Sequence, residues 1–330
     1  MTAAPRAVPQ QESASASTQT HAHTHPALAA GSATRAVRFA PAAWTDPSAL
    51  RDAVTALEAA GVTLIVLGDD FTSGSDALTT AAWLGPATST ALLVPELPVT
   101  HNEPFHAATG TATLDFAARA RGGWSPVVQT TEEEARLVGR RSAAPVAQAW
   151  REAVEIDDVV TRLWTSWEPD AEIRDEETAR FLDREKVHYV DFSGTDSVGE
   201  EFTVKGPSIV PRPPQGELPT VVTVDSPESA DAAARVADVV IVTGTAAEAG
   251  LTPDTLRTRA AHAGRSVVVL SEVPQLSTPG DAHAFVTQVQ EEPAQAEEAT
   301  GGSSAVSPAA VSPAAVPPVA APQAEGSGDS

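Results

Sequence analysis

The sequence predicts a parallel α/β protein of the TIM-type (β/α)8-barrel class that is incomplete, with about seven recognisable strands. Strand-like and helix-like segments alternate over roughly 250 residues, which is the size and rhythm of such a barrel. Continuous apolar runs such as Val62–Leu67 are typical of strands covered on both faces. An open doubly wound sheet is the rival architecture, but no Gly-x-Gly-x-x-Gly follows the first strand, and Gly68-Asp69-Asp70 after the second would repel a pyrophosphate.

Each element has a local signal. After a first strand at Val37–Ala43, Asp46-Pro47 opens a helix with Asp as N-cap and Pro at the first helical position, and Gly61 ends it. The strands expected after Val62–Leu67 are Thr90–Val94, Trp124–Val128, Thr220–Val224, Val239–Val242 and Ser266–Leu270. The other expected helices are Ser75–Leu84, Glu103–Ala118, Val146–Trp167, Pro227–Ala237 and Pro253–Ala263. After Leu270 we expect one short helix near Asp281 and no eighth strand.

Composition divides the chain into three parts. Residues 1–34 and 291–330 are rich in Ala, Ser, Pro and Gln or Glu, bury too little to repay the entropy of ordering, and are expected to be disordered. The barrel is expected over residues 35–290. Residues 130–219 form a long insertion after the fourth strand, and such loops at the carboxyl face of a barrel usually build or cover the functional site.

Charge and residue content exclude several classes of function. A net charge of −23 disfavours nucleic-acid and membrane-surface partners, and the lack of cysteine excludes disulfides, thiol nucleophiles and Cys-ligated metals. With no apolar span or export signal, we expect a cytoplasmic protein. No metal site is expected, because the His21-x-His-x-His25 run lies in a flexible arm. Glu132–Glu134 and Asp157-Asp158 are interpreted as solvated helix surface, and no Gly-x-Ser-x-Gly, Walker or His-Glu-x-x-His motif occurs.

An ordered set of blocks resembles the luciferase-like flavin-dependent monooxygenases, in particular their nitrilotriacetate-monooxygenase-like branch. The blocks are Glu103-Pro-Phe-His106, Ala112-Thr-Leu-Asp115, Arg121-Gly-Gly-Trp124, Leu163-Trp-Thr-Ser-Trp-Glu168, Lys186-Val-His-Tyr189 and Lys205-Gly-Pro-Ser-Ile-Val-Pro-Arg-Pro-Pro-Gln-Gly216. Their order and spacing agree from about Arg35 to Phe285. The set is more specific than any one block.

This resemblance implies a barrel that binds reduced FMN at the carboxyl ends of its strands and uses dioxygen to insert one oxygen atom into a small organic substrate. It also implies a separate flavin reductase that supplies the reduced FMN, and a homodimer or a heterodimer with a paralogue. A deazaflavin in place of FMN is not excluded.

The candidate site residues follow predicted strands. His101, the catalytic candidate, and Thr100 come just after the third strand, where an imidazole could hydrogen-bond the flavin or the activated oxygen, or simply cap the next helix. His106, one turn inside that helix, is interpreted as structural. Asp69, after the second strand, matches the acidic position of the family near the flavin ring, although an Asp there could equally cap a helix.

The remaining cofactor-binding candidates are Arg121, Trp124, Ser125 and Ser226. Ser226 opens a helix whose terminal amides could hold the FMN phosphate, although it could be a plain N-cap. Arg121 could stabilise the same phosphate or end the preceding helix, and Trp124 could flank the flavin or fill the barrel. Ser125 stands where the family has the Asn of "WN-x-VTS".

Three departures from the family pattern keep a second hypothesis open. The fourth strand has Pro126 and lacks the Asn and Thr that bind flavin, Asp225 and Glu228 flank the expected phosphate position, and the last strand is missing. The chain is therefore either an FMN-dependent monooxygenase or a divergent barrel that is catalytically weak or inactive, or serves as the partner subunit of an active paralogue.

Overall fold

Parallel strands form the centre of a computed structural model of the chain. The structure describes residue 28 and residues 34–41, 46–72, 74, 76–271 and 273–299. The run from His21 to His25 lies outside these residues, as do most of the arm at 1–34 and residues 300–330 of the tail.

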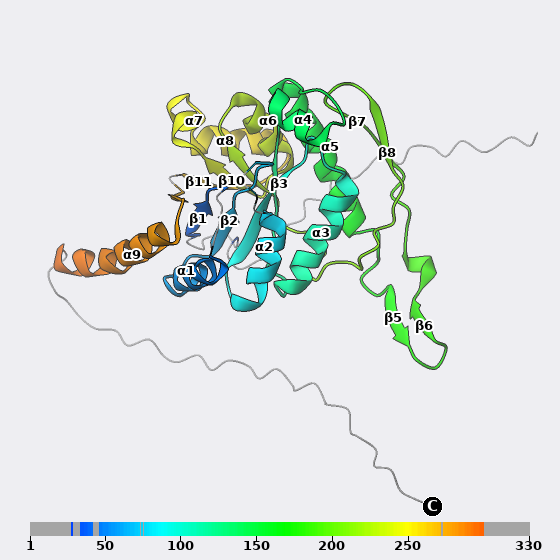
Figure 1. The fold of residues 1–330 in the computed structure, drawn as a ribbon, viewed down its shortest axis with the longest axis horizontal. Coiled ribbons are helices and arrows are strands. Elements are labelled where there is room, and N and C mark those ends of the chain that lie inside the picture. Colours follow the sequence, from blue (N-terminus) through cyan, green and yellow to red (C-terminus); the bar gives the residue numbers. More distant parts are fainter. Residues whose placement is uncertain are drawn as a thin grey trace, which may run out of the picture. The chain divides into compact units, whose positions relative to one another are not determined.

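The core strands are separated by helices along the chain, as the alternation of the sequence predicts (Figure 1). The strands are β1 (Ala36–Phe39), β2 (Leu64–Leu67), β3 (Leu92–Pro98), β4 (Ser125–Val127), β5 (Glu172–Asp175), β6 (Arg180–Leu182), β7 (Phe192–Thr195), β8 (Glu201–Val204), β9 (Val221–Val224), β10 (Val239–Val242), β11 (Val268–Ser271) and β12 (Gln275–Leu276). The helices are α1 (Pro47–Ala59), α2 (Ala77–Leu84), α3 (Pro104–Ala117), α4 (Glu132–Val138), α5 (Val146–Trp164), α6 (Pro227–Val236), α7 (Gly244–Glu248), α8 (Pro253–His262) and α9 (Pro279–Ala299).

The parallel strands follow one another in the order of a barrel. Strands β12-β1-β2-β3-β4 form one sheet and β11-β10-β9 a second, and a parallel bridge between Trp124 and Thr220 joins β4 to β9. The chain from Val268 to Leu276 pairs with β10 through β11 and with β1 through β12. No continuous ladder closes the ring among the described residues. The prediction that no eighth strand is present is wrong, because the two-residue strand β12 pairs with β1 and occupies the eighth position.

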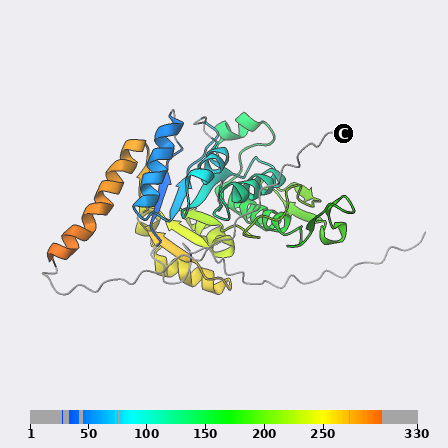
Figure 2. The ribbon, with the colours of Figure 1, turned by 90° about the horizontal axis from the view of Figure 1, so that it is seen from below.

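Side chains alternate between two sides of the strands. Ala36, Leu64 and Val66 contribute to a cluster enclosed by the strands, to which β9 and β10 add Val221 and Val239. The residues between them on β1 and β2 face a second cluster shared with α1 and α2. Helices α1 and α8 lie on opposite sides of the strands (Figure 2). This two-sided burial explains why the strands are continuous apolar runs.

Helix α1 begins as its sequence predicts. The Asp46 carboxylate accepts hydrogen bonds from the amides of Ser48, at 2.9 Å, and Ala49, at 3.2 Å, and Pro47 occupies the first turn. Leu50, Ala53, Val54 and Leu57 form its buried face, at the spacing of one helical stripe.

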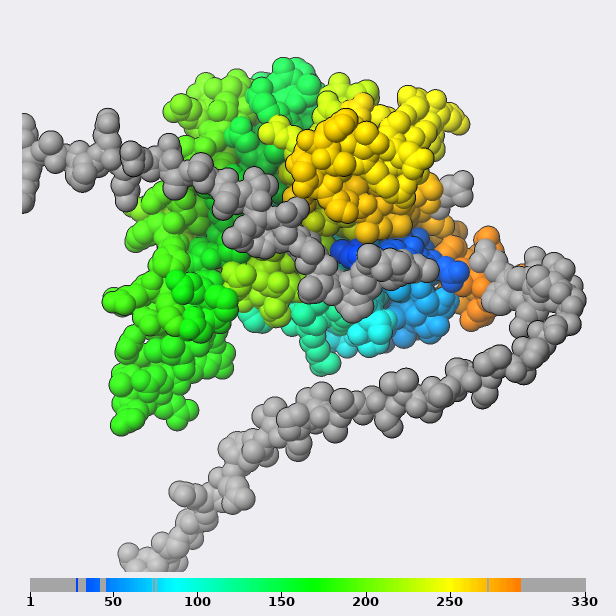
Figure 3. Space-filling view, turned by 180° about the vertical axis from the view of Figure 1, so that it is seen from behind, coloured from blue at the N-terminus to red at the C-terminus, as the bar shows by residue number. Residues whose placement is uncertain are grey.

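The insertion of residues 130–219 contains more structure than the one long helix that the sequence predicts there. In addition to α5 it holds α4 and two antiparallel hairpins, β5–β6 and β7–β8. Hairpin β5–β6 extends away from the parallel strands (Figures 1 and 3). Near the C-terminus, α9 is longer than the predicted short helix and continues to Ala299, within the segment predicted to be a tail.

Candidate functional site

A cavity of about 370 Å³ lies where β1, β3, β4 and β9 end. Arg38 and Glu96 form part of its wall, Thr223, Asp225 and Ser226 form another part, and Val127 and Trp150 contribute apolar surface. Because parallel strands present their carboxyl ends at the same edge, residues far apart in the sequence meet here, as in other barrels.

Arg38 and Glu96 form an ion pair across the strands. The Arg38 guanidinium donates two hydrogen bonds of 2.7 Å to the two Glu96 carboxylate oxygens and one of 3.0 Å to Gln275 Oε1. The Glu96 side chain is 2% exposed and that of Arg38 21%. A buried carboxylate is tolerated only with such a partner. Sequence reasoning missed the pair; the available signal was a charge at an inward position of two otherwise apolar strands.

Two hydroxyl groups near this ion pair have no hydrogen-bond partner within the described structure. They are Ser125 Oγ and Thr223 Oγ1. Ser125 is fully buried and is opposite Glu96 in the β3–β4 ladder, and Thr223 lines the cavity. Buried hydroxyls are normally satisfied, so two unsatisfied ones at one end of a barrel indicate a place for a polar ligand or ordered water. Ser125 was predicted; Thr223 was not.

His101 and Thr100 lie at the carboxyl end of β3, as predicted, but have different surroundings. Thr100 Oγ1 accepts a 2.9 Å hydrogen bond from the Gln129 amide, and the Thr100 amide donates one of 3.2 Å to Gln129 Oε1. Thr100 therefore joins the ends of β3 and β4.

The His101 imidazole is 3% exposed, and neither ring nitrogen has a partner among the described residues. The Phe71 ring lies 6.5 Å from it, centroid to centroid. Burial lowers the pKa of His101, and the nearby positive charge of Arg141 lowers it further. The ring is therefore neutral at pH 7, with one donor and one acceptor nitrogen available. The capping alternative is not realised, because no hydrogen bond joins the ring to α3.

Asp69 follows β2 and contacts the start of α2, where its Oδ2 accepts a 2.7 Å hydrogen bond from the Ala77 amide. Burial raises the pKa of Asp69 to about 6 in spite of this hydrogen bond, and the neighbouring Asp76 and Asp70 add to the rise. The carboxyl group thus makes the capping contact and also titrates near neutral pH, so a capping role does not exclude a functional role for Asp69.

Arg121 lies at the opposite end of the barrel from the cavity. Its guanidinium donates to Thr88 Oγ1 and to the carbonyl oxygens of Ala91, Gly85 and Thr88, at 2.8 to 3.0 Å. These acceptors precede β3, at the amino ends of the strands. These contacts favour the structural role of Arg121 over phosphate binding, because its donors are directed at Thr88 and at backbone carbonyls on the opposite end from the cavity.

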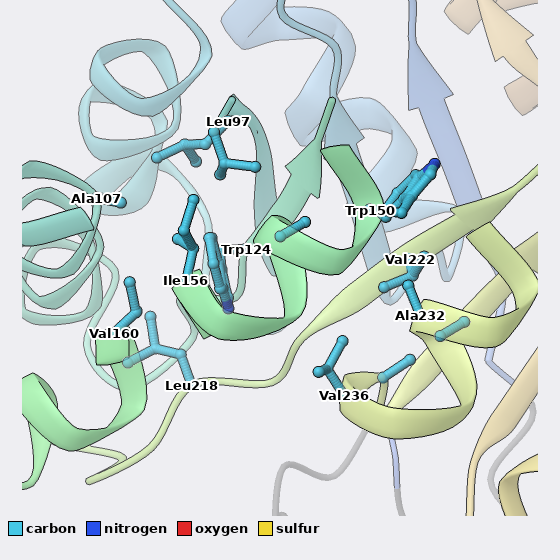
Figure 4. Packing of buried hydrophobic residues seen from close by; sticks show 14 of the residues in the cluster. Leu97, Ala107, Trp124, Trp150, Ile156, Val160, Leu218, Val222, Ala232 and Val236 are labelled. Carbon is cyan, nitrogen blue, oxygen red and sulfur yellow. The ribbon is translucent and has the colours of Figure 1, made fainter. Parts of the chain in front are cut away.

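Trp124 is on the outer side of the strands, where it packs with Leu97 of β3 and Ile156 of α5 (Figure 4). Its indole Nε1 donates a 3.0 Å hydrogen bond to Thr220 Oγ1, and Trp164 meets it edge to face at 6.1 Å. Trp124 therefore has neither of the two roles considered for it from the sequence, since it neither flanks the cavity nor fills the barrel interior. It fills the layer between strands and helix α5.

Ser226 lines the cavity and also caps α6. Its hydroxyl accepts a 3.2 Å hydrogen bond from the Ser229 amide, while Ser229 Oγ accepts from the amides of Ser226, at 3.0 Å, and Asp225, at 3.1 Å. The plain N-cap interpretation is therefore realised, and the amides that would bind a phosphate are occupied by the protein itself. A second, larger cavity, of about 430 Å³, lies at the amino ends of the strands.

That second cavity contains Asp157, which was interpreted as solvated surface. The structure corrects this interpretation, because Asp157 Oδ1 accepts a 2.9 Å hydrogen bond from Thr220 Oγ1, and burial raises its pKa to about 7.

His106 is exposed, as its structural interpretation requires. Over the residues with described positions, no cluster of His, Asp and Glu could hold a metal ion. No helix in the same residues is long and apolar enough to cross a membrane.

Comparison with known proteins identifies the family to which the chain belongs. The profile described as luciferase-like monooxygenase matches residues 15–298. Nitrilotriacetate monooxygenase component A of Aminobacter aminovorans is 34% identical over 183 residues, which are 55% of this chain and 39% of that protein. N-acetyl-S-(2-succino)cysteine monooxygenase of Bacillus subtilis (strain 168) is 34% identical over 157 residues, 48% of this chain and 34% of that protein. The chain thus matches somewhat more than a third of the length of these curated relatives.

Solved structures agree on the fold. The long-chain alkane monooxygenase LadA superimposes with a TM-score of 0.66 at 20% identity, covering 72% of this chain and 63% of LadA. EDTA monooxygenase (EmoA) from Chelativorans sp. BNC1 superimposes with a TM-score of 0.61 at 19% identity, covering 81% of this chain and 69% of that one. The strand order, the position of the cavity and the profile match agree. The chain belongs to the luciferase-like monooxygenase family.

Proposed function

We propose that the protein is a flavin-dependent monooxygenase that oxidises a small organic substrate with dioxygen. The observation that carries this proposal is the buried His101 imidazole with two unpartnered nitrogens, at the same barrel end as a cavity and two unpartnered hydroxyls. Perturbed titratable groups gathered at the carboxyl end of parallel strands favour a reactive site.

The protein residues would supply binding and orientation. Reduced flavin, when bound, supplies the electrons that activate dioxygen. The neutral His101 ring can donate one hydrogen bond and accept another, and Ser125 and Thr223 offer hydroxyls to the same end of the barrel. Asp69, with a pKa of about 6, can hold or release a proton near neutral pH. Trp150 and Val127 provide apolar walls that exclude water.

The site suits the flavin ring of FMN better than it suits the FMN phosphate. The unpartnered imidazole and hydroxyls suit the polar edge of a flavin ring. The start of α6 does not suit a phosphate, because its capping residues already bind the amides. This mismatch favours the second candidate function, a divergent flavin-binding barrel with weak or no catalysis, acting alone or as the partner of an active paralogue.

Partners follow from the proposed chemistry. The resemblance to nitrilotriacetate monooxygenase component A supports a two-component arrangement, in which a separate flavin reductase supplies the reduced flavin. Assembly into a homodimer or a heterodimer and a cytoplasmic location remain part of this proposal.

An anaerobic titration tests the proposal. Purified full-length protein is mixed with reduced and oxidised flavin, binding is followed by fluorescence and absorbance, and air is then admitted with candidate substrates. Binding of reduced flavin below millimolar concentration, with substrate-dependent oxygen consumption, supports the monooxygenase. Binding without turnover supports the divergent barrel. If no flavin binds below millimolar concentration, both flavin-binding roles are wrong, and the result favours a partner subunit that does not bind flavin itself.

A further inference from the structure

Resting on the proposed function, we infer that the cavity selects a flavin without a terminal phosphate, riboflavin, over FMN. The inference concerns the α6 side of the cavity, where Thr223, Asp225 and Ser226 form the wall. Three properties of this wall carry it: the occupied amides, the net charge and the kind of hydrogen-bonding groups that face the cavity.

The first turn of α6 has few free amides that could bind an anion. Helix N-termini bind phosphate through free amides. Here the amides of Asp225 and Ser226 donate to Ser229 Oγ, and the Ser229 amide donates to Ser226 Oγ. Pro227 has no N–H, which leaves the Glu228 amide, beside a carboxylate of its own. A phosphate would have to displace a capping box.

The charge of the wall opposes a dianion as well. Arg38 is the one cation among the described residues that line this cavity, and it is bound through two nitrogens to Glu96. Asp225 adds a carboxylate without a compensating cation in the lining, and Glu228 follows on the same turn. A phosphate monoester carries a charge of about −1.5 to −2 at pH 7. It would therefore enter a wall of net negative charge.

The same groups complement a neutral polyol. Carboxylates accept hydrogen bonds, and the ribityl hydroxyls of riboflavin donate them. Asp225 is exposed at this wall, so its carboxylate oxygens are accessible to such donors. A wall rich in acceptors thus binds a chain of hydroxyls and repels a phosphate dianion, which has acceptor oxygens only.

Equilibrium titrations of the full chain with riboflavin and with FMN test the inference. At pH 7.5 and 50 mM salt we expect riboflavin to bind at least ~10-fold more tightly than FMN, because exposed carboxylates repel the dianion over a Debye length of more than ~10 Å. At 500 mM salt this ratio should fall to about 3 or less, since screening removes repulsion and leaves the neutral ligand unaffected.

The variant Asp225→Asn/Glu228→Gln keeps the shape of the wall and removes its two negative charges. It should tighten FMN binding by about 10-fold at low salt and leave riboflavin binding within about 3-fold. The control is Glu132→Gln/Glu133→Gln, which makes the same change in net charge at the exposed start of α4 and should leave the ratio unchanged.

The outcomes separate this inference from the proposed function. If FMN binds as tightly as riboflavin or more tightly at low salt, or if the α6 variant does not change the ratio, the inference is overturned while flavin binding stands. If neither flavin binds, the proposed function fails and the inference fails with it.

Discussion

At the level of single residues, hydrogen-bond satisfaction separates structural from functional polar groups. Arg121 and His101 are both buried polar side chains close to strands of the same barrel. Arg121 donates to four acceptors, whereas His101 has no partner in the described chain. A buried polar group without a partner costs stability, so its retention indicates a role in the bound state.

His101→Phe should remove function without loss of stability. Phenylalanine replaces the imidazole with another planar aromatic ring and removes two unsatisfied nitrogens. We therefore expect the free energy of unfolding to stay within ~1 kcal/mol or to rise. Flavin binding or turnover should fall by ~10-fold or more. Urea denaturation and flavin titration measure the two effects, with His106→Phe on the exposed side of α3 as the control. A loss of more than ~2 kcal/mol would mark His101 as a packing residue.

Arg121→Met should have the opposite result. It leaves the carbonyls of Gly85, Thr88 and Ala91 without their donor, and we expect a loss of ~2–4 kcal/mol in the free energy of unfolding with the flavin Kd of the folded protein unchanged. Arg119→Met, at an exposed neighbouring position, is the control. Weaker flavin binding with unchanged stability would restore the phosphate role.

At the level of elements, the loop that leads into β3 depends on one carboxylate of α1. Glu58 accepts hydrogen bonds from the amides of Ser89, Thr90 and Ala91, at 2.6 to 3.0 Å. Although burial opposes ionisation, these hydrogen bonds together lower the pKa of Glu58 from 4.5 to about 2. A lowered folded-state pKa stabilises the fold above pH 4.5, and this contribution disappears as the pH falls towards 2.

Glu58→Gln should therefore destabilise the protein at pH 7 by ~1 kcal/mol, a value reduced because the carboxylate is partly exposed. The difference between wild type and variant should shrink as the pH falls from 4.5 towards 2. Chemical denaturation at pH 7, 4 and 3 gives this difference. A gap that does not depend on pH would show that the ionised carboxylate of Glu58 is not what holds the loop.

Asp157 on α5 gives the reverse pH dependence. Burial raises the pKa of Asp157 to about 7, so the folded state binds more protons than the unfolded state, and stability falls as the pH rises from 3.8 to about 7. Asp157→Asn can still accept from Thr220 and should be more stable than wild type at pH 8 by at least ~1 kcal/mol, with no gain at pH 4. Asp158→Asn, an exposed neighbour paired with Arg162, is the surface control. A variant less stable at pH 8 would contradict the assignment.

Local sequence predicts the elements well where one signal acts alone. The apolar runs at β2 and β10 and the Asp46-Pro47 start of α1 are confirmed, because burial on both faces and capping are local effects. Strand β12 was missed because two residues, Gln275 and Leu276, carry no periodicity and are held by pairing with β1. The hairpins β5–β6 and β7–β8 were missed because their short strands are mostly half-exposed and polar.

The candidate site could be predicted only in part for a related reason. His101, Asp69 and Ser226 follow strands, and chain order alone places them at the carboxyl end. Chain order also places Arg121, which precedes the fourth strand, at the amino end, whereas the pairing of Arg38 with Glu96 joins positions 58 residues apart. Such contacts arise because distant strands come together around one interior, which no local pattern contains.

At the level of the whole molecule, the chain from Val268 to Leu276 links the two sheets, since its first part pairs with β10 and its second with β1. The Arg38–Gln275 hydrogen bond adds a side-chain contact at this junction. Strands β11 and β12 thus take the places of the last two strands of a complete barrel, which explains how a chain with about seven strand signals encloses one apolar cluster.

Leu28 extends that enclosed cluster beyond the strands. It lies in the arm that the sequence predicts to be disordered, yet it packs against the cluster that contains Leu64, Leu92 and Val221. Leu28→Ala should therefore lower the free energy of unfolding by ~1–2 kcal/mol, less than for a fully buried leucine because the side chain is partly exposed. Urea denaturation of the full chain measures this loss.

Two further variants make the expectation specific to Leu28. Removal of residues 1–26 should leave the urea midpoint unchanged, and Leu137→Ala, at a side chain that is 58% exposed, should change the free energy of unfolding by less than ~0.5 kcal/mol. Removal of residues 1–34 should reproduce the loss of Leu28→Ala, since it deletes the same contact. If the longer deletion is as stable as the shorter one, the arm contributes nothing to the barrel, and the strands alone enclose its interior.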